Sequence, residues 1–408
     1  MNSQPPPTLC TNTDADVLPD VPRYEGIRDR RLLEQSFEDM WEKAGWRYLR
    51  SKRDYVKWRA PGIDNVTLPY AADHLDELID QRLDRLSALP YGPMPAKRYY
   101  IDEGSKQRPI AIMTVPDTIV SRALLELVRK PLEKPLPDTN FAYLQGVGPQ
   151  QRVDHITSMV DEYGWIVQLD IKSYFDSIPH HLLYERIDRL IVDPDLLALL
   201  WEFVTQPIRE NGRDRATTVG VPQGGVISPV LANLYLAPLD EAMLAEGWGY
   251  ARYADDFVIF TPTKAEARRA RDYAAEIISE LGLQVHRSGR KQAFVGRTAG
   301  GFEFCGHLYK WYGDHVYVAP RMAKIEEVTW TIAGISRLGY GCDHDLVRWL
   351  TPHWSVVSDP VKVRMSCLAL GLSKAVDRAA AAAYHGSSYM RSYLHELYGR
   401  YQADTPFG

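Results

Sequence analysis

The sequence predicts an α+β protein with a split βαβ sheet and a helical C-terminal module. Two observations favour this class, and the length of the chain sets the number of subdomains. Runs rich in Val, Ile, Tyr and Phe are separated by longer helical blocks, so strands that pair need not be neighbours along the chain. The sequence beyond Pro320 has mostly the hydrophobic periodicity of helices. With 408 residues, of which 45% are hydrophobic, the chain is long enough for two or three subdomains around a sizeable core.

The N-terminal part is expected to be mainly helical. Residues 1–22 are rich in Pro, Asp and Thr, a composition typical of a flexible arm. Helical periodicity begins near Asp29, in RRLLEQSFEDMWEKAGW, and returns in HLDELIDQRLDRLSAL (74–89). The turn-rich stretch APGIDNVT separates the two expected helices.

The middle of the chain mixes expected strands and helices. The stretch YYIDEGSKQRPIAIMTV predicts two strands around a Gly-Ser turn, and DTIVSRALLELVRKPLEK predicts a helix after them. The run WIVQLDIKSYF (165–175) is typical of a strand, and a helical block follows at 181–206. The Gly/Pro cluster GVPQGGVISP (220–229) leads into an expected helix, VLANLYLAPLDEAML.

The last third begins with a hairpin. RYADDFVIF (252–260) predicts two short strands with an acidic pair at the turn. TKAEARRARDYAAEIISELG predicts an amphipathic helix closed by Gly282. FEFCGHLYKW and HVYVAP predict a further strand pair, after which a helical tail is expected over 321–402.

Composition limits the class of protein. The formal charge of −5 argues against a surface coated with basic residues, although it allows a local basic groove. The four cysteines are scattered without a CxxC pair, which argues against a zinc ribbon or a disulfide framework and is typical of a reducing cytoplasm. The N-terminus lacks the pattern of a signal peptide, and no stretch approaches about 18 consecutive apolar residues. We therefore expect a cytoplasmic protein with no membrane partner.

Three aspartates stand out because their surroundings are apolar. Asp170 lies in a run rich in Val, Leu and Ile, where a carboxylate is costly unless it is paired or binds a metal. Asp255 and Asp256 are adjacent and repel each other. Taken singly, Asp170 could face water at a sheet edge, and the acidic pair could be a solvated turn.

Taken together, the aspartates indicate a metal centre. Phosphoryl transfer with two metal ions needs carboxylates from separate strand ends, and Mg²⁺ prefers one or two carboxylates plus phosphate oxygens and water. An aspartate on one strand and two more on a hairpin turn would provide such a set. The Gly/Pro cluster at 220–229 between them could let the backbone approach a ligand closely, although a tight loop would have the same composition.

The order and spacing of these motifs resemble the palm motifs of reverse transcriptases. The resemblance rests on Asp170 in LDIKSYFDSI, on the PQG loop at 222–224 and on the YADD box at 253–256. The resemblance is strongest to the prokaryotic group II intron-like branch. Members of that branch have sequence motifs similar to APGIDNVT, RPIAIMTVPDTIVSRAL, GLQVHRSGRKQAF and FEFCGHLY. The resemblance covers roughly residues 30–320.

The resemblance implies a right-hand polymerase with two-metal-ion chemistry. Fingers and palm, with an antiparallel palm sheet, would occupy residues 23–320, and residues 321–408 would form a helical thumb. The cofactor would be two Mg²⁺ ions, with Mn²⁺ as a possible substitute. The metal ligands would be the carboxylates of Asp170, Asp255 and Asp256 and the main-chain carbonyl of Ile171.

The resemblance also implies contacts to the incoming nucleotide. Phe175 would stack under the sugar and exclude a 2′-hydroxyl, although it could instead be a core aromatic. Gln223 and Gly224 would border the nucleotide, and Arg108 would bind the triphosphate. Relatives usually carry a lysine where this chain has an acidic pair, and Lys106 could substitute for that lysine.

Two further roles follow from the same resemblance. Lys291 would protonate the leaving pyrophosphate, although it could equally be a surface lysine. FEFCGHLY resembles the primer grip, whose residues here would be Phe304, Cys305 and Gly306.

The resemblance implies an RNA template, a DNA primer and product, and deoxynucleotides as partners. The region CLALGLSKAVDRAAAAAYHGSSYMRSYLHELYGRY does not match the aromatic pattern of intron maturases. We therefore favour a stand-alone reverse transcriptase that copies a dedicated non-coding RNA in bacterial antiphage defence, with homo-oligomers possible. The alternatives are a group II intron-encoded reverse transcriptase/maturase, an RNA-dependent RNA polymerase and a non-catalytic RNA-binding scaffold.

Overall fold

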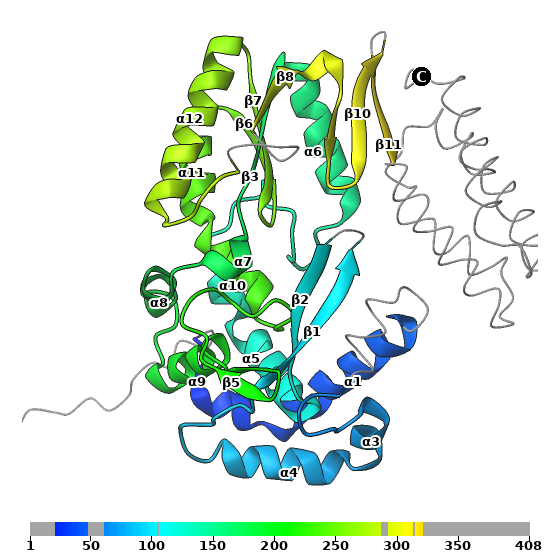
Figure 1. Ribbon diagram of the computed structural model, residues 1–408, viewed down its shortest axis with the longest axis vertical. Helices are drawn as coiled ribbons and strands as arrows, with labels where there is room; N and C mark the ends of the chain where they lie inside the picture. The colour runs from blue at the N-terminus through cyan, green and yellow to red at the C-terminus, as the bar shows by residue number, and fades with distance from the viewer. Residues whose placement is uncertain (1–20, 48–60, 104–105, 287–292, 313–314, 321–408) are drawn as a thin grey trace, which may run out of the picture.

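The computed structural model describes residues 21–47, 61–103, 106–286, 293–312 and 315–320 (Figure 1). Its elements form three sheets, which we call the N-terminal sheet (β2-β1-β4-β5), the central sheet (β6-β7-β3-β8) and the C-terminal sheet (β11-β10-β9). The expected tail at 321–408 and the arm at 1–20 lie outside the described residues. The mixed α/β class predicted from the sequence is confirmed.

The central sheet has the split βαβ topology that the sequence predicts. All three of its pairings are antiparallel, and β7 lies between β6 and β3. Strand β6 is the next strand of this sheet after β3 along the chain, so two strands that follow each other in this sheet's chain order are separated by a third. The strands are β3 (Trp165–Asp170), β6 (Gly249–Tyr253), β7 (Asp256–Thr261) and β8 (Phe294–Arg297).

Both faces of the central sheet are covered. Helices α11 (Ala237–Ala245) and α12 (Lys264–Glu280) lie on one face, and α6 (Pro149–Glu162) lies on the other (Figure 1). Successive strand residues point to opposite faces. Val167 and Ile259 accordingly belong to the larger core, whereas Ile166, Val258 and Phe260 belong to a smaller core shared with the C-terminal sheet. This burial on two sides explains why β3 and β7 are almost continuously apolar.

The N-terminal sheet is a hairpin extended by a short second hairpin. Strands β1 (Ala96–Glu103) and β2 (Lys106–Ile112) pair antiparallel, as expected, while β4 (Ile208–Glu210) joins β1 in parallel and pairs with β5 (Arg213–Arg215). The long helix α5 (Val115–Glu133) packs nearby against α1 (Arg30–Arg47), α4 (Leu75–Arg85) and α10 (Ser228–Tyr235). Helix α3 (Leu68–Asp73) precedes α4, and a 3₁₀ turn (Tyr24–Arg28) precedes α1.

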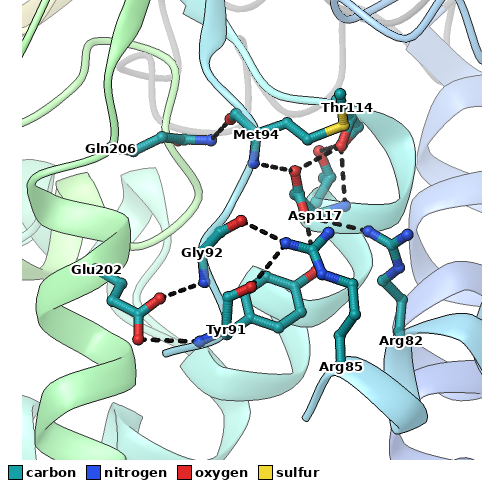
Figure 2. Close-up of polar contacts among 10 residues, drawn as sticks. Arg82, Arg85, Tyr91, Gly92, Met94, Thr114, Asp117, Glu202 and Gln206 are labelled. Carbon is teal, nitrogen blue, oxygen red and sulfur yellow. Dashed lines mark hydrogen bonds and ion pairs between the residues drawn. The ribbon is translucent and has the colours of Figure 1, made fainter. Parts of the chain in front are cut away.

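A buried carboxylate holds this N-terminal region together (Figure 2). Asp117, in the first turn of α5, has no exposed surface and accepts hydrogen bonds from the Tyr91 hydroxyl at 2.6 Å, the Thr114 hydroxyl at 2.8 Å and the Met94 amide at 2.9 Å. Arg82 of α4 lies 3.5 Å away as an ion-pair partner. Asp117 therefore ties the segment before β1 to both α4 and α5, and Arg85 of α4 adds hydrogen bonds to the carbonyls of Tyr91 and Gly92.

Two segments differ from the sequence expectations. The run 165–175 is a strand only as far as Asp170, because Ser173 adopts a left-handed conformation (φ 48°) that turns the chain into the short helix α7 (Tyr174–Ser177). The expected helix after the Gly/Pro cluster is two helices, α10 and α11, broken at Leu236. Pro238 explains the break, since proline has no amide hydrogen and is tolerated only in the first turn of the following helix.

The remaining elements agree with the expectations or add to them. The block at 181–206 contains α8 (His180–Asp188) and α9 (Pro194–Val204), and α12 ends before Gly282, whose φ of 70° closes the helix. The C-terminal sheet consists of β9 (Phe302–Phe304), β10 (His307–Tyr312) and β11 (His315–Pro320), after a 3₁₀ turn at Thr298–Gly300. Among the described helices none is long and apolar enough to cross a membrane.

Candidate active site

The YADD box forms a tight hairpin at one end of the central sheet. Tyr253 of β6 pairs with Asp256 of β7, which leaves Ala254 and Asp255 as the two turn residues. Ala254 has a φ of 58° and is buried, and such positive φ is typical of two-residue hairpin turns. Asp255 therefore occupies the tip of the turn, and Asp256 begins the following strand.

The third aspartate lies beside this turn. Asp170 is the last residue of β3, and the antiparallel register places it directly opposite Asp256. Its main-chain carbonyl accepts a hydrogen bond from the amide of His286 at 3.0 Å, which fixes the end of the strand. Ile171 pairs with Val285 in a bridge that uses the main-chain groups of the residues flanking Ile171, so the carbonyl of Ile171 itself points away from Val285.

The chemistry of these residues fits a divalent cation. Two carboxylates face each other across neighbouring strands, and a third follows at the turn. Within the described ranges, no three His, Cys, Asp or Glu side chains form a ready metal-binding group. Mg²⁺ typically takes only one or two carboxylates and completes its shell with water and substrate phosphates, so the facing pair Asp170 and Asp256 provides carboxylates enough for one ion.

The PQG loop is fixed from two sides. The amide of Val221 donates to the carbonyl of Phe175 in α7 at 2.7 Å, and the amide of Ala111 in β2 donates to the carbonyl of Gln223 at 2.7 Å. Gly224 has a φ of 108°, and a Cβ atom there would lie 2.6 Å from the Ala111 carbonyl oxygen. Glycine is therefore required where the loop crosses β2.

The amide of Gln223 is oriented by two charged neighbours. Its oxygen accepts a hydrogen bond from Nε of Arg108 at 3.4 Å, and its nitrogen donates to Asp176 at 2.8 Å. Partial burial of the carboxyl group raises the pKa of Asp176, an effect that the nearby Arg98 and the hydrogen bond from Gln223 oppose. Residues from β2, from the PQG loop and from α7 thus form one polar chain.

Phe175 lies between this polar chain and the core. It is partly buried, and its ring packs edge-on against Tyr174 with ring centroids 5.6 Å apart. Tyr174 is fully enclosed, so burial raises its pKa, and the charge of Asp255 raises it further. The ring of Phe175 is therefore supported from behind by a neutral tyrosine next to the YADD turn.

The proposed primer-grip residues form a second tight hairpin near the aspartates. Phe304 pairs with His307, so Cys305 and Gly306 are the turn residues, with φ of 49° and 80°. Burial raises the pKa of the Cys305 thiol, and the charge of Asp256 contributes in the same direction. The turn after β9 therefore lies close to the first residue of β7.

Three predicted features cannot be placed. Lys291 and the segment 321–408 lie outside the described residues. The backbone of Lys106 begins β2 opposite Glu103, but its side chain is not among those described.

The structure adds residues that the sequence reasoning missed. Asp176 joins the polar chain of Gln223 and Arg108. Arg252, Asp240 and Asn233 form a fully buried polar network directly behind the YADD turn. The sequence contains a signal for this network. Arg252 and Asp240 carry opposite charges and lie in otherwise apolar segments, so they could have been identified as a buried ion pair by the reasoning that applies to Asp170.

Comparison with known proteins identifies the family. The family described as "Reverse transcriptase (RNA-dependent DNA polymerase)" matches residues 101–307, which contain all three aspartates, the PQG loop and the YADD box. Protein YkfC of Escherichia coli (strain K12) is 29% identical over 327 residues, covering 69% of this chain and 83% of that protein.

Other relatives match over shorter stretches. The group II intron-encoded protein LtrA of Lactococcus lactis subsp. cremoris is 32% identical over 175 residues, which are 41% of this chain and 28% of that protein. The structure of telomerase from Candida albicans aligns at a TM-score of 0.47 and 11% identity, covering 77% of this chain and 62% of that one. The family match spans half of the sequence, and the chain therefore belongs to the reverse transcriptase family of RNA-directed DNA polymerases.

Proposed function

We propose that this chain synthesises DNA at the end of the central sheet where Asp170, Asp255 and Asp256 meet. The observation that carries the proposal is the register of the sheet, which sets Asp170 opposite Asp256 and leaves Asp255 at the adjoining turn. These carboxylates, with the carbonyl of Ile171, would hold two Mg²⁺ ions, or Mn²⁺ as a substitute. Bound there, the ions would stabilise the charge that develops on the attacking hydroxyl and on the leaving pyrophosphate.

The surrounding side chains would bind and select the nucleotide. Arg108 would contact the triphosphate, since a guanidinium matches phosphate oxygens with its fork of N–H donors. Gln223, oriented by Arg108 and Asp176, would border the nucleotide, with Gly224 allowing close approach of the loop. Phe175 would exclude the 2′-hydroxyl of a ribonucleotide, and Lys291 would protonate the leaving pyrophosphate.

We further propose a dedicated non-coding RNA as the template and antiphage defence as the role. The support is the sequence between Cys367 and Tyr401, which does not carry the aromatic pattern of intron maturases. DNA primer and product and deoxynucleotides would be the other partners, and residues 321–408 would act as the thumb. A group II intron role is the alternative, because LtrA, a group II intron-encoded protein, is among the relatives.

Primer extension on an RNA template tests the proposed chemistry. We expect deoxynucleotide incorporation by the wild type and none by the Asp255→Ala/Asp256→Ala double variant, because both lost carboxylates are proposed metal ligands. Phe175→Ala should increase ribonucleotide incorporation while deoxynucleotide incorporation persists. Equal use of both nucleotide classes by the wild type would contradict the role of Phe175 and favour an RNA polymerase.

Sequencing the RNA and DNA that co-purify with the protein tests the proposed template. We expect one recurring non-coding RNA together with its complementary DNA. Recovery of a spliced or unspliced intron would instead support the maturase alternative. If the double aspartate variant retained full protection against phage, the protein would be a binding scaffold rather than a polymerase in that role.

A further inference from the structure

Arg252, directly before the YADD box, is buried to an unusual degree. Its side chain has no exposed surface, although it carries a full charge. Burying an ion strongly destabilises the folded state unless the hydrogen bonds of the ion are completed. The groups around this guanidinium must therefore supply acceptors for its N–H donors.

All five N–H donors of the Arg252 guanidinium are used. Nε and Nη2 donate to the two carboxylate oxygens of Asp240 in α11, at 2.6 and 2.5 Å. Nη1 and Nη2 donate to the side-chain and main-chain oxygens of Asn233 in α10, at 3.1 and 3.2 Å. The remaining N–H of Nη1 donates to the main-chain carbonyl of Ala254, at 3.1 Å. A guanidinium has no further donors, so the network is complete.

The main chain of Arg252 is held as well. Its amide donates to the carbonyl of Thr139, and its carbonyl accepts from the amide of Phe141, both at 2.9 Å. Asn233 connects the two sets of contacts, because its side-chain nitrogen donates to the carbonyl of Ala142, in the same segment, at 2.5 Å. The residue before the YADD box is thus fixed by α10, α11 and the segment 139–142 together.

The contact to Ala254 reaches the proposed metal ligands. The Ala254 carbonyl belongs to the peptide group that carries the amide of Asp255, at the tip of the turn. Ala254 also has a positive φ, which is unfavourable for a residue with a Cβ atom. A hydrogen bond to this carbonyl from an immobile donor restricts the orientation of the peptide and with it the position of Asp255.

We infer that Arg252 is a positioning residue that sets the geometry of the metal-binding turn through the Ala254 carbonyl, with Asp240 and Asn233 holding the guanidinium in place. This inference rests on the proposed metal role of the aspartates. Burial alone would lower the pKa of the Arg252 guanidinium, but the adjacent Asp240 carboxylate outweighs this effect and raises that pKa. Lysine could not replace Arg252, since its ammonium is a point donor with three N–H groups.

The test separates positioning from simple stability. Arg252→Lys keeps the charge opposite Asp240 but loses the fork of donors. Arg252→Met/Asp240→Leu removes both charges, a change that is often tolerated or stabilising for a buried pair. Arg82→Met is the matched control, because it removes the partner of another buried carboxylate, Asp117, in the N-terminal region (Figure 2).

Two quantities are measured on each full-length variant. One is the thermal unfolding midpoint. The other is the dissociation constant of Mn²⁺, from electron paramagnetic resonance of the free ion, with dNTP and a template–primer ended by a dideoxynucleotide so that no turnover occurs. We expect the dissociation constant to rise about 10- to 100-fold in both Arg252 variants, whatever their midpoints, as is typical when a partner of metal ligands is lost. Arg82→Met should lower the midpoint and leave Mn²⁺ binding unchanged.

The outcomes are distinct. Wild-type Mn²⁺ affinity in either folded Arg252 variant would overturn the positioning role, as would an equal loss of affinity in Arg82→Met. If one Arg252 variant does not fold, the other decides. Asp255→Ala/Asp256→Ala tests the underlying proposal separately: if that variant binds Mn²⁺ like the wild type, the metal role of the aspartates fails and the effect of Arg252 cannot act through it.

Discussion

At the scale of single residues, the amide of Gln223 shows how neighbours orient a side chain. Arg108 donates to the amide oxygen of Gln223, and Asp176 accepts from its amide nitrogen. The two hydrogen bonds therefore fix which way the amide group is turned. A free glutamine would sample several rotamers, and holding one of them costs conformational entropy that the two partners offset. Asp176 is therefore expected to act on nucleotide binding through Gln223.

Substitution of Asp176 tests this. Asp176→Ala removes the acceptor for the Gln223 nitrogen and is expected to raise the KM for dNTP about 5- to 30-fold, the equivalent of one or two lost hydrogen bonds. Asp176→Asn keeps an acceptor oxygen and should remain close to the wild type. Steady-state primer extension with varied dNTP measures both, and equal KM values for Asp176→Ala and the wild type would contradict the orienting role.

The raised pKa of Asp176 also predicts a pH dependence of stability. Because burial raises the pKa in the folded state, the folded protein holds this proton more tightly than the unfolded chain, and stability falls as the pH rises through the shifted pKa. Asp176→Asn resembles the protonated form. Its unfolding midpoint relative to the wild type should be highest near neutral pH and should decrease as the pH falls below about 4, where Asp176 becomes protonated in both the folded and the unfolded wild type. A difference independent of pH would contradict this reading.

At the scale of elements, the PQG loop is the part that joins two regions. It bonds to α7 through Val221 and to β2 through Gln223, so the proposed nucleotide site forms only when these elements are in register. The family resemblance predicts that this loop borders the nucleotide. The sequence pattern does not predict α7, because a strand pattern continues through residues 171–175. The left-handed Ser173 that ends the strand has no clear sequence signal.

Gly224→Ala should displace the loop. The added Cβ would lie 2.6 Å from the Ala111 carbonyl oxygen, at a φ that alanine rarely adopts. We expect the KM for dNTP to rise by about 10-fold or more, since strain of 1–3 kcal/mol would be relieved only by moving the loop off β2. Gly146→Ala is the control: its φ is 74°, but no atom lies within 4 Å of the new Cβ, so it should lower stability slightly and leave KM unchanged. A normal KM in Gly224→Ala would show that the loop tolerates the displacement.

At the scale of the whole molecule, buried charges link segments that are distant in sequence. Arg252 and Asp240 do so behind the YADD turn, and Asp117 does so in the N-terminal region, where it joins the segment at Tyr91–Met94 to α4 and α5 (Figure 2). Glu202 of α9 adds to the second network by accepting hydrogen bonds from the amides of that same segment. Removing one member of such a network leaves the others buried without partners, which is costly.

Asp117→Ala is accordingly expected to lower the free energy of unfolding by about 3–5 kcal/mol, because Arg82 and three hydrogen-bond donors would lose their acceptor. Asp117→Asn retains an acceptor and should cost about 1–3 kcal/mol. Urea denaturation monitored by circular dichroism measures both changes. Equal stability of Asp117→Ala and the wild type would show that the network does not hold this region together.

The sequence by itself determined the class of fold, most of the helices and strands, and the three aspartates of the proposed metal centre. These follow from local signals: hydrophobic periodicity, turn residues and a spaced motif set. Tertiary structure alone decided that Asp170 faces Asp256, that Gln223 lies between Arg108 and Asp176, and that Arg252 donates to the Ala254 carbonyl. Such contacts join residues brought together only by strand register and helix packing, and the free energy of each depends on burial that no local pattern records.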